Sequence, residues 1–400
     1  MSESITQGRA DAGATEASGV TPSTGTRPTP VMCVSVQQAD LKAALAVVNR
    51  VQKQRLPVLA GVRLATTGEG LALARTDLEL ELIRTVPARV DTPGACIAPA
   101  AALAQIVREL PRGAVTLESD GVALTVRCSI FTATLPCFRL DDFPAVPDGG
   151  ETVAEVDAGW LRDVAAHVLP AAATDSTRPI LTAVDLWIDG GAVASVAAAD
   201  GFRLAAWDGF RTARLGPEAR RFLLPARALR QAVKCLPRAG AVAIGAIGPE
   251  RATLSWDGAQ ANLWLVEGQY PRLEEVIPRD PPVTVIADTA ALLEACKALR
   301  PAAQEAGDAV RLGVAPGAPL RMWTLKEGVV TAEVAVDVQA AGEGDFVIGF
   351  HVDYLIDALA PVRATTVRIG LTKPAAPARI EAADPAEPYL AVVMPMHLRG

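Results

Sequence analysis

Hydrophobic side chains recur along the chain with two different periods. Leu41, Leu45 and Val48 follow Asp40 at spacings of three and four residues, which predicts a helix with one apolar face that Asp40 caps. Between residues 115 and 119 hydrophobic and polar side chains alternate, which predicts a strand with one buried face. Segments of both kinds follow one another along the chain, so the pattern indicates a mixed α and β protein.

One helical pattern occurs twice almost unchanged. The form P-x3-L-x3-V-x2-L-P-R begins at Pro99 and again at Pro225, 126 residues later. A weaker third copy keeps the four-then-three spacing with Val352, Ile356 and Leu359. A chain of 400 residues that repeats at an interval of about 125 is predicted to hold three copies of one domain.

Each copy is predicted to contain two helices and about eight short strands. The first helices are expected from residue 40, from residue 157 and over residues 290–299, and the second over residues 99–112, 225–238 and 351–359. Helices separated by several strands favour an α+β fold with antiparallel sheets, with helices on one side and sheets on the other. The predicted domains span residues 31–150, 151–281 and 282–400, placed end to end as an arc.

Composition limits the class of protein. Half of the residues are hydrophobic but only 4% are aromatic, so each domain is expected to bury a core of Ala, Val, Leu and Ile. No apolar run approaches the roughly 18 residues of a membrane span. Residues 1–30 are small and polar and lack the basic start and apolar stretch of a signal peptide, so they are predicted to be a disordered tail. Met32 is an alternative start, which would leave the tail untranslated.

Cysteine and histidine usage gives no ligand motif. The six cysteines are scattered without a C-x-x-C pair, which favours reduced thiols in a cytoplasmic protein. His167, His351 and His397 lie far apart in the sequence. We therefore expect neither a metal site nor a cofactor.

The repeated helices are predicted to carry a basic face. At 100° per residue, the second copy places four basic side chains within about 80° of one another, with its apolar side chains opposite. The basic residues are Arg227, Arg230, Lys234 and Arg238 in the second copy and Arg108 and Arg112 in the first. A solvated charged face is the simplest interpretation of one such helix. Its recurrence in a chain of net charge −7 favours contact with a phosphate backbone.

Motifs of common catalytic sites are absent from the sequence. It holds no G-x-S-x-G, no P-loop, no H-E-x-x-H and no G-x-G-x-x-G. Asp77, Glu79 and Glu81 alternate with leucines, which predicts a strand with one face in water rather than a paired-carboxylate site. An enzyme built on repeated α+β domains is therefore the least favoured hypothesis.

Several longer motifs carry a family resemblance. They are LPVLAGVRL (residues 56–64), RTDLELEL (75–82), TLPCFRLDDFP (134–144), AADGFRLA (198–205), EGQYPRLEEVIP (267–278) and VVMPMHL (392–398). Over residues 32–398 the chain resembles the bacterial β sliding clamp, the processivity subunit of DNA polymerase III. The resemblance implies a non-catalytic, head-to-tail homodimer, closed into a ring of six similar domains around duplex DNA. Repeat one of one subunit would meet repeat three of the other through edge strands such as residues 130–135.

The resemblance also assigns residues to two surfaces. Facing the DNA, without sequence preference, would be Lys53, Arg55, Arg108, Arg112, Arg178, Arg227, Arg230, Lys234 and Arg238. A pocket for partner peptides would be lined by Leu181, Gly201, Phe202, Arg203, Leu204, Pro271, Val276, Val392, Met394, Pro395, Met396 and Leu398. Its implied partners are the α subunit of the replicative DNA polymerase, the clamp loader, and other clamp-binding polymerases and repair proteins. Strand alternation would send Met394 and Met396 to one face, either into this pocket or into the core.

Some positions depart from the family pattern. Phe202 stands where the family often has His, Ala199 where it often has Thr, and His397 where it often has Arg; Glu275 replaces a usual basic residue. Residues 179–180 replace an aromatic pair. These changes bear on partner preference. The alternative function is that of a clamp-like paralogue, which binds partner peptides in a regulatory or lesion-bypass role without being the main clamp.

Overall fold

The computed structural model describes residues 31–52, 56–145, 150–175, 177–207, 216, 218–315, 317–327, 329–342 and 346–397. The tail predicted at residues 1–30 lies outside this part of the chain. No helix in the described part is both long and apolar enough to cross a membrane.

The element order repeats three times. Repeat one holds β1 (Met32–Gln37), α1 (Gln38–Val48), β2 (Gly61–Thr67), β3 (Gly70–Thr76), β4 (Leu80–Val86), β5 (Ala88–Thr92), β6 (Ala95–Pro99), α2 (Ala100–Glu109), β7 (Ala114–Ser119), β8 (Ala123–Cys128) and β9 (Phe131–Pro136). Repeat two holds β10 (Glu151–Asp157), α3 (Ala158–Val168), β11 (Ala183–Asp189), β12 (Ala192–Ala199), β13 (Arg203–Trp207), β14 (Arg220–Pro225), α4 (Ala226–Val233), β15 (Ala241–Ile247), β16 (Arg251–Trp256) and β17 (Ala259–Trp264). Repeat three holds β18 (Val283–Asp288), α5 (Thr289–Glu305), β19 (Ala309–Val314), β20 (Leu320–Lys326), β21 (Val329–Val336), β22 (Val338–Ala341), β23 (Phe346–His351), α6 (Val352–Leu359), β24 (Thr366–Leu371), β25 (Ala378–Ala382) and β26 (Tyr389–Val393).

The predicted pair of helices is confirmed in each repeat, although helix ends differ from the prediction. Helix α1 begins before Asp40, because Gln38 is itself buried and donates its side-chain amide to the Val107 carbonyl at 2.7 Å. Asp157 caps α3 by accepting from the backbone N–H groups of its first turn. Helix α4 ends at Val233, so Arg238 lies in the following loop rather than on the helix.

The strands of neighbouring repeats join into continuous antiparallel sheets. The sheet orders are β5-β1-β7-β8-β9, β10-β15-β16-β17-β4-β3-β2-β6, β14-β11-β12-β13-β26-β25-β24-β18-β22 and β21-β20-β19-β23. Thus β4 of repeat one pairs with β17 of repeat two, and β13 of repeat two pairs with β26 of repeat three. Main-chain hydrogen bonds between strands therefore join repeat one to repeat two and repeat two to repeat three.

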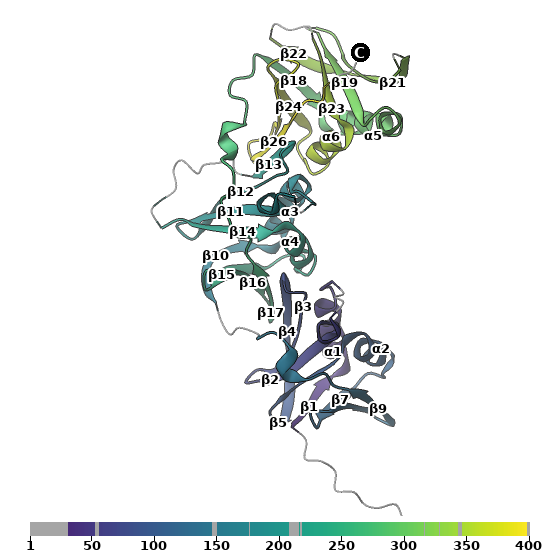
Figure 1. Ribbon diagram of the computed structural model, residues 1–400, viewed down its shortest axis with the longest axis vertical. Coiled ribbons are helices and arrows are strands. Elements are labelled where there is room, and N and C mark those ends of the chain that lie inside the picture. The colour runs from purple at the N-terminus through teal and green to yellow at the C-terminus, as the bar shows by residue number, and fades with distance from the viewer. Residues whose placement is uncertain are drawn as a thin grey trace, which may run out of the picture.

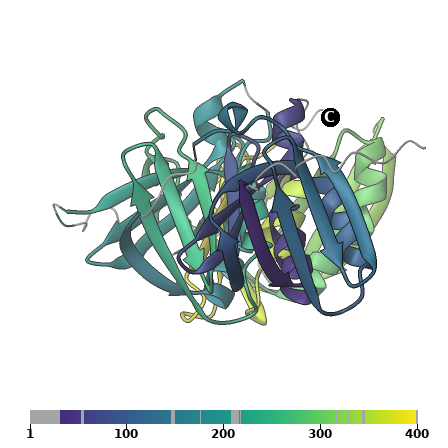
Figure 2. The same ribbon diagram turned by 90° about the horizontal axis from the view of Figure 1, so that it is seen from below.

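The repeats follow one another along the long axis of the molecule. In repeat two, α3 and α4 lie on the opposite side from β10 and β11 (Figure 1). Seen along the long axis, helices of repeats one and three overlap on one side and strands of repeat two occupy the other (Figure 2). This arrangement confirms the predicted separation of helices and antiparallel sheets.

The acidic residues between positions 77 and 81 do not form the solvent-exposed strand face that their alternation predicts. Leu78 has φ +75° and its side chain is 50% exposed, while Glu81 is only 1% exposed. The cause is the joint between repeats one and two, where Glu81 lies opposite Asn262 across the β4–β17 pair. Asn262 Nδ2 donates to Glu81 Oε2 at 2.7 Å, but Oε1 has no hydrogen-bond partner among the described residues. Burial raises the pKa of the Glu81 carboxyl.

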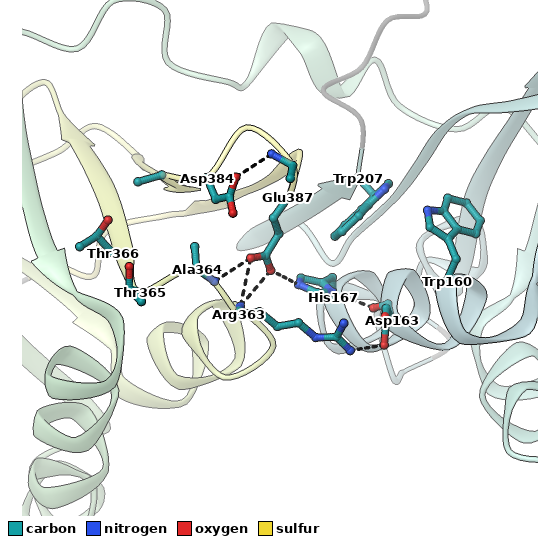
Figure 3. A pocket seen from close by; sticks show the side chains of 12 residues that line it. Trp160, Asp163, His167, Trp207, Arg363, Ala364, Thr365, Thr366, Asp384 and Glu387 are labelled. Carbon is teal, nitrogen blue, oxygen red and sulfur yellow. Dashed lines mark hydrogen bonds and ion pairs between the residues drawn. The ribbon is translucent and has the colours of Figure 1, made fainter. Parts of the chain in front are cut away.

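The joint between repeats two and three is held by a different polar cluster (Figure 3). Glu387 Oε1 lies 2.8 Å from His167 Nε2, and the Glu387 carboxylate accepts from the backbone N–H groups of Arg363 and Ala364. His167 Nδ1 lies 2.7 Å from the Asp163 carbonyl oxygen, to which it can only donate. The Arg363 guanidinium contacts the Asp163 carboxylate. These contacts fix α3 against the end of repeat three.

Replacing Glu81 with Gln is expected to stabilise the protein at alkaline pH. The pKa of this carboxyl is raised in the folded chain, so the protonated carboxyl contributes to the free energy of unfolding. That contribution is fully present below the ordinary carboxyl pKa and is lost as the pH rises through the folded pKa. Gln avoids this loss, so the variant should gain on the order of 1 kcal/mol at about pH 8 and almost nothing near pH 4. Thermal unfolding at both pH values measures the difference, with the exposed Glu69→Gln as control. A variant less stable than the parent at about pH 8 would show that the ionised carboxylate is favoured instead.

Candidate functional site

Helix α4 and the loop after it divide into an apolar and a basic face, as predicted. Leu229, Val233 and Leu236 are buried in the core. The side chains on the other face are exposed; they are Arg227, Arg230, Lys234 and Arg238. The apolar face packs α4 against its sheet, which leaves the basic face directed outwards.

Two of these basic side chains are held by other parts of the chain. Arg227 Nε lies 3.0 Å from Glu79 Oε2, and its Nη2 lies 3.5 Å from Asp77 Oδ2, both in repeat one. Arg230 donates to the Leu169 carbonyl at 3.1 Å. By contrast, neither Lys234 nor Arg238 has an ion-pair partner among the described residues. The available positive charge of this face therefore lies mainly at its C-terminal end.

The basic face is uneven between the repeats. In repeat one, Arg108 pairs with its neighbour Glu109 at 2.9 Å, and Arg112 is exposed. In repeat three, α6 carries Asp353 and Asp357 instead. Two predicted DNA-facing residues, Lys53 and Arg55, lie outside the described residues.

Arg178 lies apart from α4, next to the tight turn after β12. Gly201 in that turn has φ +94°, and a β-carbon there would lie 3.1 Å from Arg178 Nη1. The backbone conformation there favours glycine, and a β-carbon would press on the arginine beside it. Arg178 therefore lies beside Gly201, a predicted pocket residue, and neither of them lines the cavity between repeats two and three.

A cavity of about 800 Å³ lies where repeats two and three meet. Four of the predicted pocket residues line it: Phe202, Met394, Pro395 and Met396. Strand β26 ends at Val393, so the two methionines lie beyond the strand, where Met394 is 40% exposed. The Met394 N–H donates to the Phe202 carbonyl at 2.8 Å, which fixes this segment at the cavity wall.

The remaining predicted pocket residues occupy different environments. Leu181, Leu204 and Val392 belong to a buried hydrophobic cluster next to the cavity and do not line it. Pro271 and Val276 are exposed. The last predicted residue, Leu398, lies outside the described part of the chain.

Arg203 does not offer a free charge to the pocket, contrary to the simplest expectation. Its guanidinium contacts Asp200 Oδ2 at 2.9 Å and Asp357 Oδ2 at 2.6 Å, and its side chain is 15% exposed. The same guanidinium lies 4.3 Å from the centre of the Tyr354 ring. Arg203 therefore ties β13 of repeat two to α6 of repeat three.

Two aromatic side chains of the cavity were missed by sequence reasoning. His351 and Tyr354 line it, and their rings stack with centroids 4.4 Å apart. They belong to the third and weakest copy of the repeated helix motif, so their position gave no signal of its own. Their flat faces suit an aromatic or hydrophobic peptide side chain.

No group of three His, Cys, Asp or Glu side chains within the described residues is arranged to hold a metal ion. The candidate site therefore consists of a cavity lined by both apolar and polar side chains and a basic helix face. Both features serve binding rather than bond chemistry.

Three family models match the chain in succession. The model of the DNA polymerase III beta subunit, N-terminal domain, matches residues 32–147, that of the central domain matches residues 155–272, and that of the C-terminal domain matches residues 274–397.

Curated relatives and solved structures agree with these matches. The beta sliding clamp of Pseudomonas aeruginosa is 30% identical over 374 residues, 92% of this chain and 100% of the relative. That of Caulobacter vibrioides is 28% identical over 382 residues, with the same coverage. A crystal structure of the Pseudomonas aeruginosa clamp with ligand has a TM-score of 0.81 at 28% identity, covering 92% of this chain and 100% of that chain. A Caulobacter crescentus clamp structure, with PEG bound to a putative beta-motif tethering region, has a TM-score of 0.79 at 26% identity, covering 92% and 99%. The chain therefore belongs to the beta sliding clamp family, the non-catalytic beta subunits of DNA polymerase III, and functions as a DNA sliding clamp.

Proposed function

We propose that two copies of the chain close head to tail into a ring around duplex DNA in the cytoplasm and tether the replicative DNA polymerase. The observation that carries the proposal is a pair of strand edges at the two ends of the chain. Within the described residues, β9 is the last strand of one sheet and β21 the last strand of another. Among the described strands, neither has the second neighbour that its equivalents have inside the chain.

The equivalence follows from the pairing scheme. The last strand of repeats two and three pairs with the fourth strand of the preceding repeat: β17 pairs with β4, and β26 pairs with β13. By the same scheme, β9 of one copy would pair with β21 of a second copy. Two such contacts between two copies close a finite ring and leave no end free.

The internal joints also give the register of this contact. Residues in equivalent places lie opposite each other in both joints: Ala261 with Leu82, and Ala391 with Ala205. Carried over to the ring contact, Ala133 would lie opposite Ala332, Thr132 opposite Glu333 and Leu135 opposite Val330. Phe131 is 39% exposed and Val330 43%, although monomeric proteins usually protect apolar strand edges. A partner strand would cover both.

The basic face supports contact with DNA that is blind to sequence. Lysine and arginine side chains without acidic partners attract phosphates, and such contacts weaken as salt rises. Exposed Lys234 and Arg238 supply this charge in repeat two, whereas α6 supplies acids in repeat three. We infer that repeat two provides more of the DNA contact than repeat three.

The cavity between repeats two and three supports docking of short peptides. Proposed partners are the polymerase α subunit, the clamp loader, and other clamp-binding polymerases and repair proteins. Met394 and Met396 adapt to different side chains, and the stacked His351 and Tyr354 rings form a flat wall. Because Arg203 is already paired with two aspartates, hydrophobic contact rather than charge is expected to provide the affinity.

A cysteine cross-link tests the proposed ring contact. The protein with Thr132→Cys and Glu333→Cys is expected to form covalent dimers under mild oxidation, because the register places these residues opposite each other. The control combines Thr132→Cys with Thr331→Cys, which is displaced by two residues on the same strand. Denaturing gels without reductant, with the parent protein alongside, measure the linked fraction. Equal linking in both variants, or none in either, would contradict the register.

Removing the free charges of repeat two should weaken DNA binding. The plot of log affinity against log salt has a negative slope, and the double variant Lys234→Ala and Arg238→Ala is expected to make it shallower by about one to two. The reason is that each phosphate contact contributes close to one to its magnitude. The matched control removes two exposed charges from loops between strands, with Arg272→Ala and Lys373→Ala. Binding to duplex DNA across a salt series measures both slopes. The same slope in the double variant and the parent would show that this face is only solvated.

Truncating the two methionines should weaken peptide docking without affecting assembly. The double variant Met394→Ala and Met396→Ala is expected to lose about tenfold or more in affinity, because both side chains line the cavity. The probe is a short peptide with one Gln and a hydrophobic end, titrated by calorimetry. Leu140→Ala, an exposed apolar site in repeat one, serves as control. Unchanged affinity in the double variant would reject the pocket.

A further inference from the structure

The chain segment after the last strand of each repeat crosses back to the strand that precedes the second helix. In repeat one, the Phe138 N–H donates to the Ile97 carbonyl at 2.9 Å. The same bond recurs in the other repeats, from Val266 to Leu223 at 2.9 Å and from Met396 to Gly349 at 2.8 Å. The crossing is therefore a fixed part of the fold, and its side chains can be compared between repeats.

Only repeat one places thiols at this crossing. Cys96 and Cys137 flank its hydrogen bond. The corresponding residues are Phe222 and Leu265 in repeat two, and Ile348 and Pro395 in repeat three. A cysteine can serve as a small apolar core residue. The surroundings of Cys137 decide between packing and chemistry.

The two thiols lie on the same face of this crossing. Because Ile97 pairs with Phe138, the residues that precede them lie diagonally opposite each other across the pair. Cys96 is 3% exposed, whereas Cys137 is half-buried and thus open to small solutes. Ser119 Oγ, itself buried, lies 3.9 Å from Cys137 Sγ and 3.1 Å from the Gly121 N–H that donates to it. The hydroxyl hydrogen of Ser119 is thus available to the Cys137 sulfur.

This arrangement favours a thiolate at Cys137. The pKa of Cys137 is lowered to about 7, chiefly by hydrogen bonding with Cys96 and to a smaller extent by Ser119, against the opposing effect of burial. The same pairing and burial raise the pKa of Cys96, which keeps its proton. A nucleophilic thiolate therefore lies against a second thiol, as the attacking and resolving cysteines of a redox pair do.

We propose that Cys137 and Cys96 are a redox-modification site, which forms a reversible disulfide with hydrogen peroxide as the two-electron oxidant. The Cys137 thiolate attacks one peroxide oxygen; a sulfur–oxygen bond forms, the oxygen–oxygen bond breaks, and hydroxide leaves and takes a proton. Cys96 sulfur then attacks the sulfenic sulfur of Cys137. The sulfur–sulfur bond forms, the sulfur–oxygen bond breaks, and the departing hydroxide leaves as water with the proton of Cys96. Two thiols are oxidised and one peroxide is reduced to two waters.

The disulfide would fasten the end of β9 to β6. Cys137 directly follows β9, and Cys96 lies on β6. A cross-link at this point limits the unfolded chain more than the folded one, so the oxidised protein is expected to melt several degrees higher. If β9 closes the ring, which rests on the proposed function, oxidation also stiffens the ring-closing strand.

Peptide mapping of the peroxide-treated, folded protein tests the proposal directly. We expect one dominant linked peptide, joining Cys96 to Cys137 and lighter by two hydrogen atoms, which disappears with dithiothreitol. At pH 7 the Cys137 thiol should react with a maleimide about tenfold faster than Cys33, because burial raises the pKa of Cys33 instead. Cys137→Ser should abolish the linked peptide, and Cys33→Ser should leave it unchanged.

Several outcomes would overturn the proposal: no linked peptide, links that scatter over other cysteines, or equal maleimide rates at Cys137 and Cys33. The maleimide rates come from the parent protein, so they decide the matter even if Cys137→Ser folds poorly. Mapping does not depend on ring formation. The thiol pair and the proposed ring can therefore fail separately.

Discussion

The structure depends on one interaction, the antiparallel pairing of a strand from one repeat with the last strand of the next. The β4–β17 and β13–β26 ladders turn three separate sandwiches of helix and sheet into a continuous row of sheets. The β13–β26 ladder brings Met394 next to Phe202, and the same pairing scheme leaves β9 and β21 as the edge strands of their sheets among the described residues.

The two internal joints use different side chains on the same backbone scheme. At the first, Glu81 is buried with one carboxylate oxygen unpartnered among the described residues, which costs stability when it ionises. At the second, Glu387 is matched by His167 and two backbone donors, and Arg203 bridges Asp200 and Asp357. The second joint also forms the wall of the 800 Å³ cavity, so the contacts that hold repeats two and three together also shape the proposed docking site.

The sequence predicted what depends on local pattern. The repeated motif located three domains, the helical spacing located both helices of each, and the apolar face of α4 is buried as expected. It could not show what depends on contacts between distant residues. The alternation around Glu81 predicted a solvent-exposed face, because the local sequence does not show that β17 pairs with β4 and buries Glu81. Arg227 was predicted to face DNA and Arg203 to line the pocket, but Arg227 pairs with Glu79, 148 residues away, and Arg203 pairs with Asp357, 154 residues away, as well as with nearby Asp200. His351 and Tyr354 were missed because the cavity forms only when repeat three packs on repeat two.

The central claim is that the chain holds DNA by enclosing it rather than by gripping it. The most direct measurement is the lifetime of the loaded protein on a circular duplex, before and after one restriction cut, at constant salt. The account predicts long retention on the closed circle and rapid loss after linearisation, because a ring slides off a free end. Equal rates of loss from circular and linear DNA would contradict it.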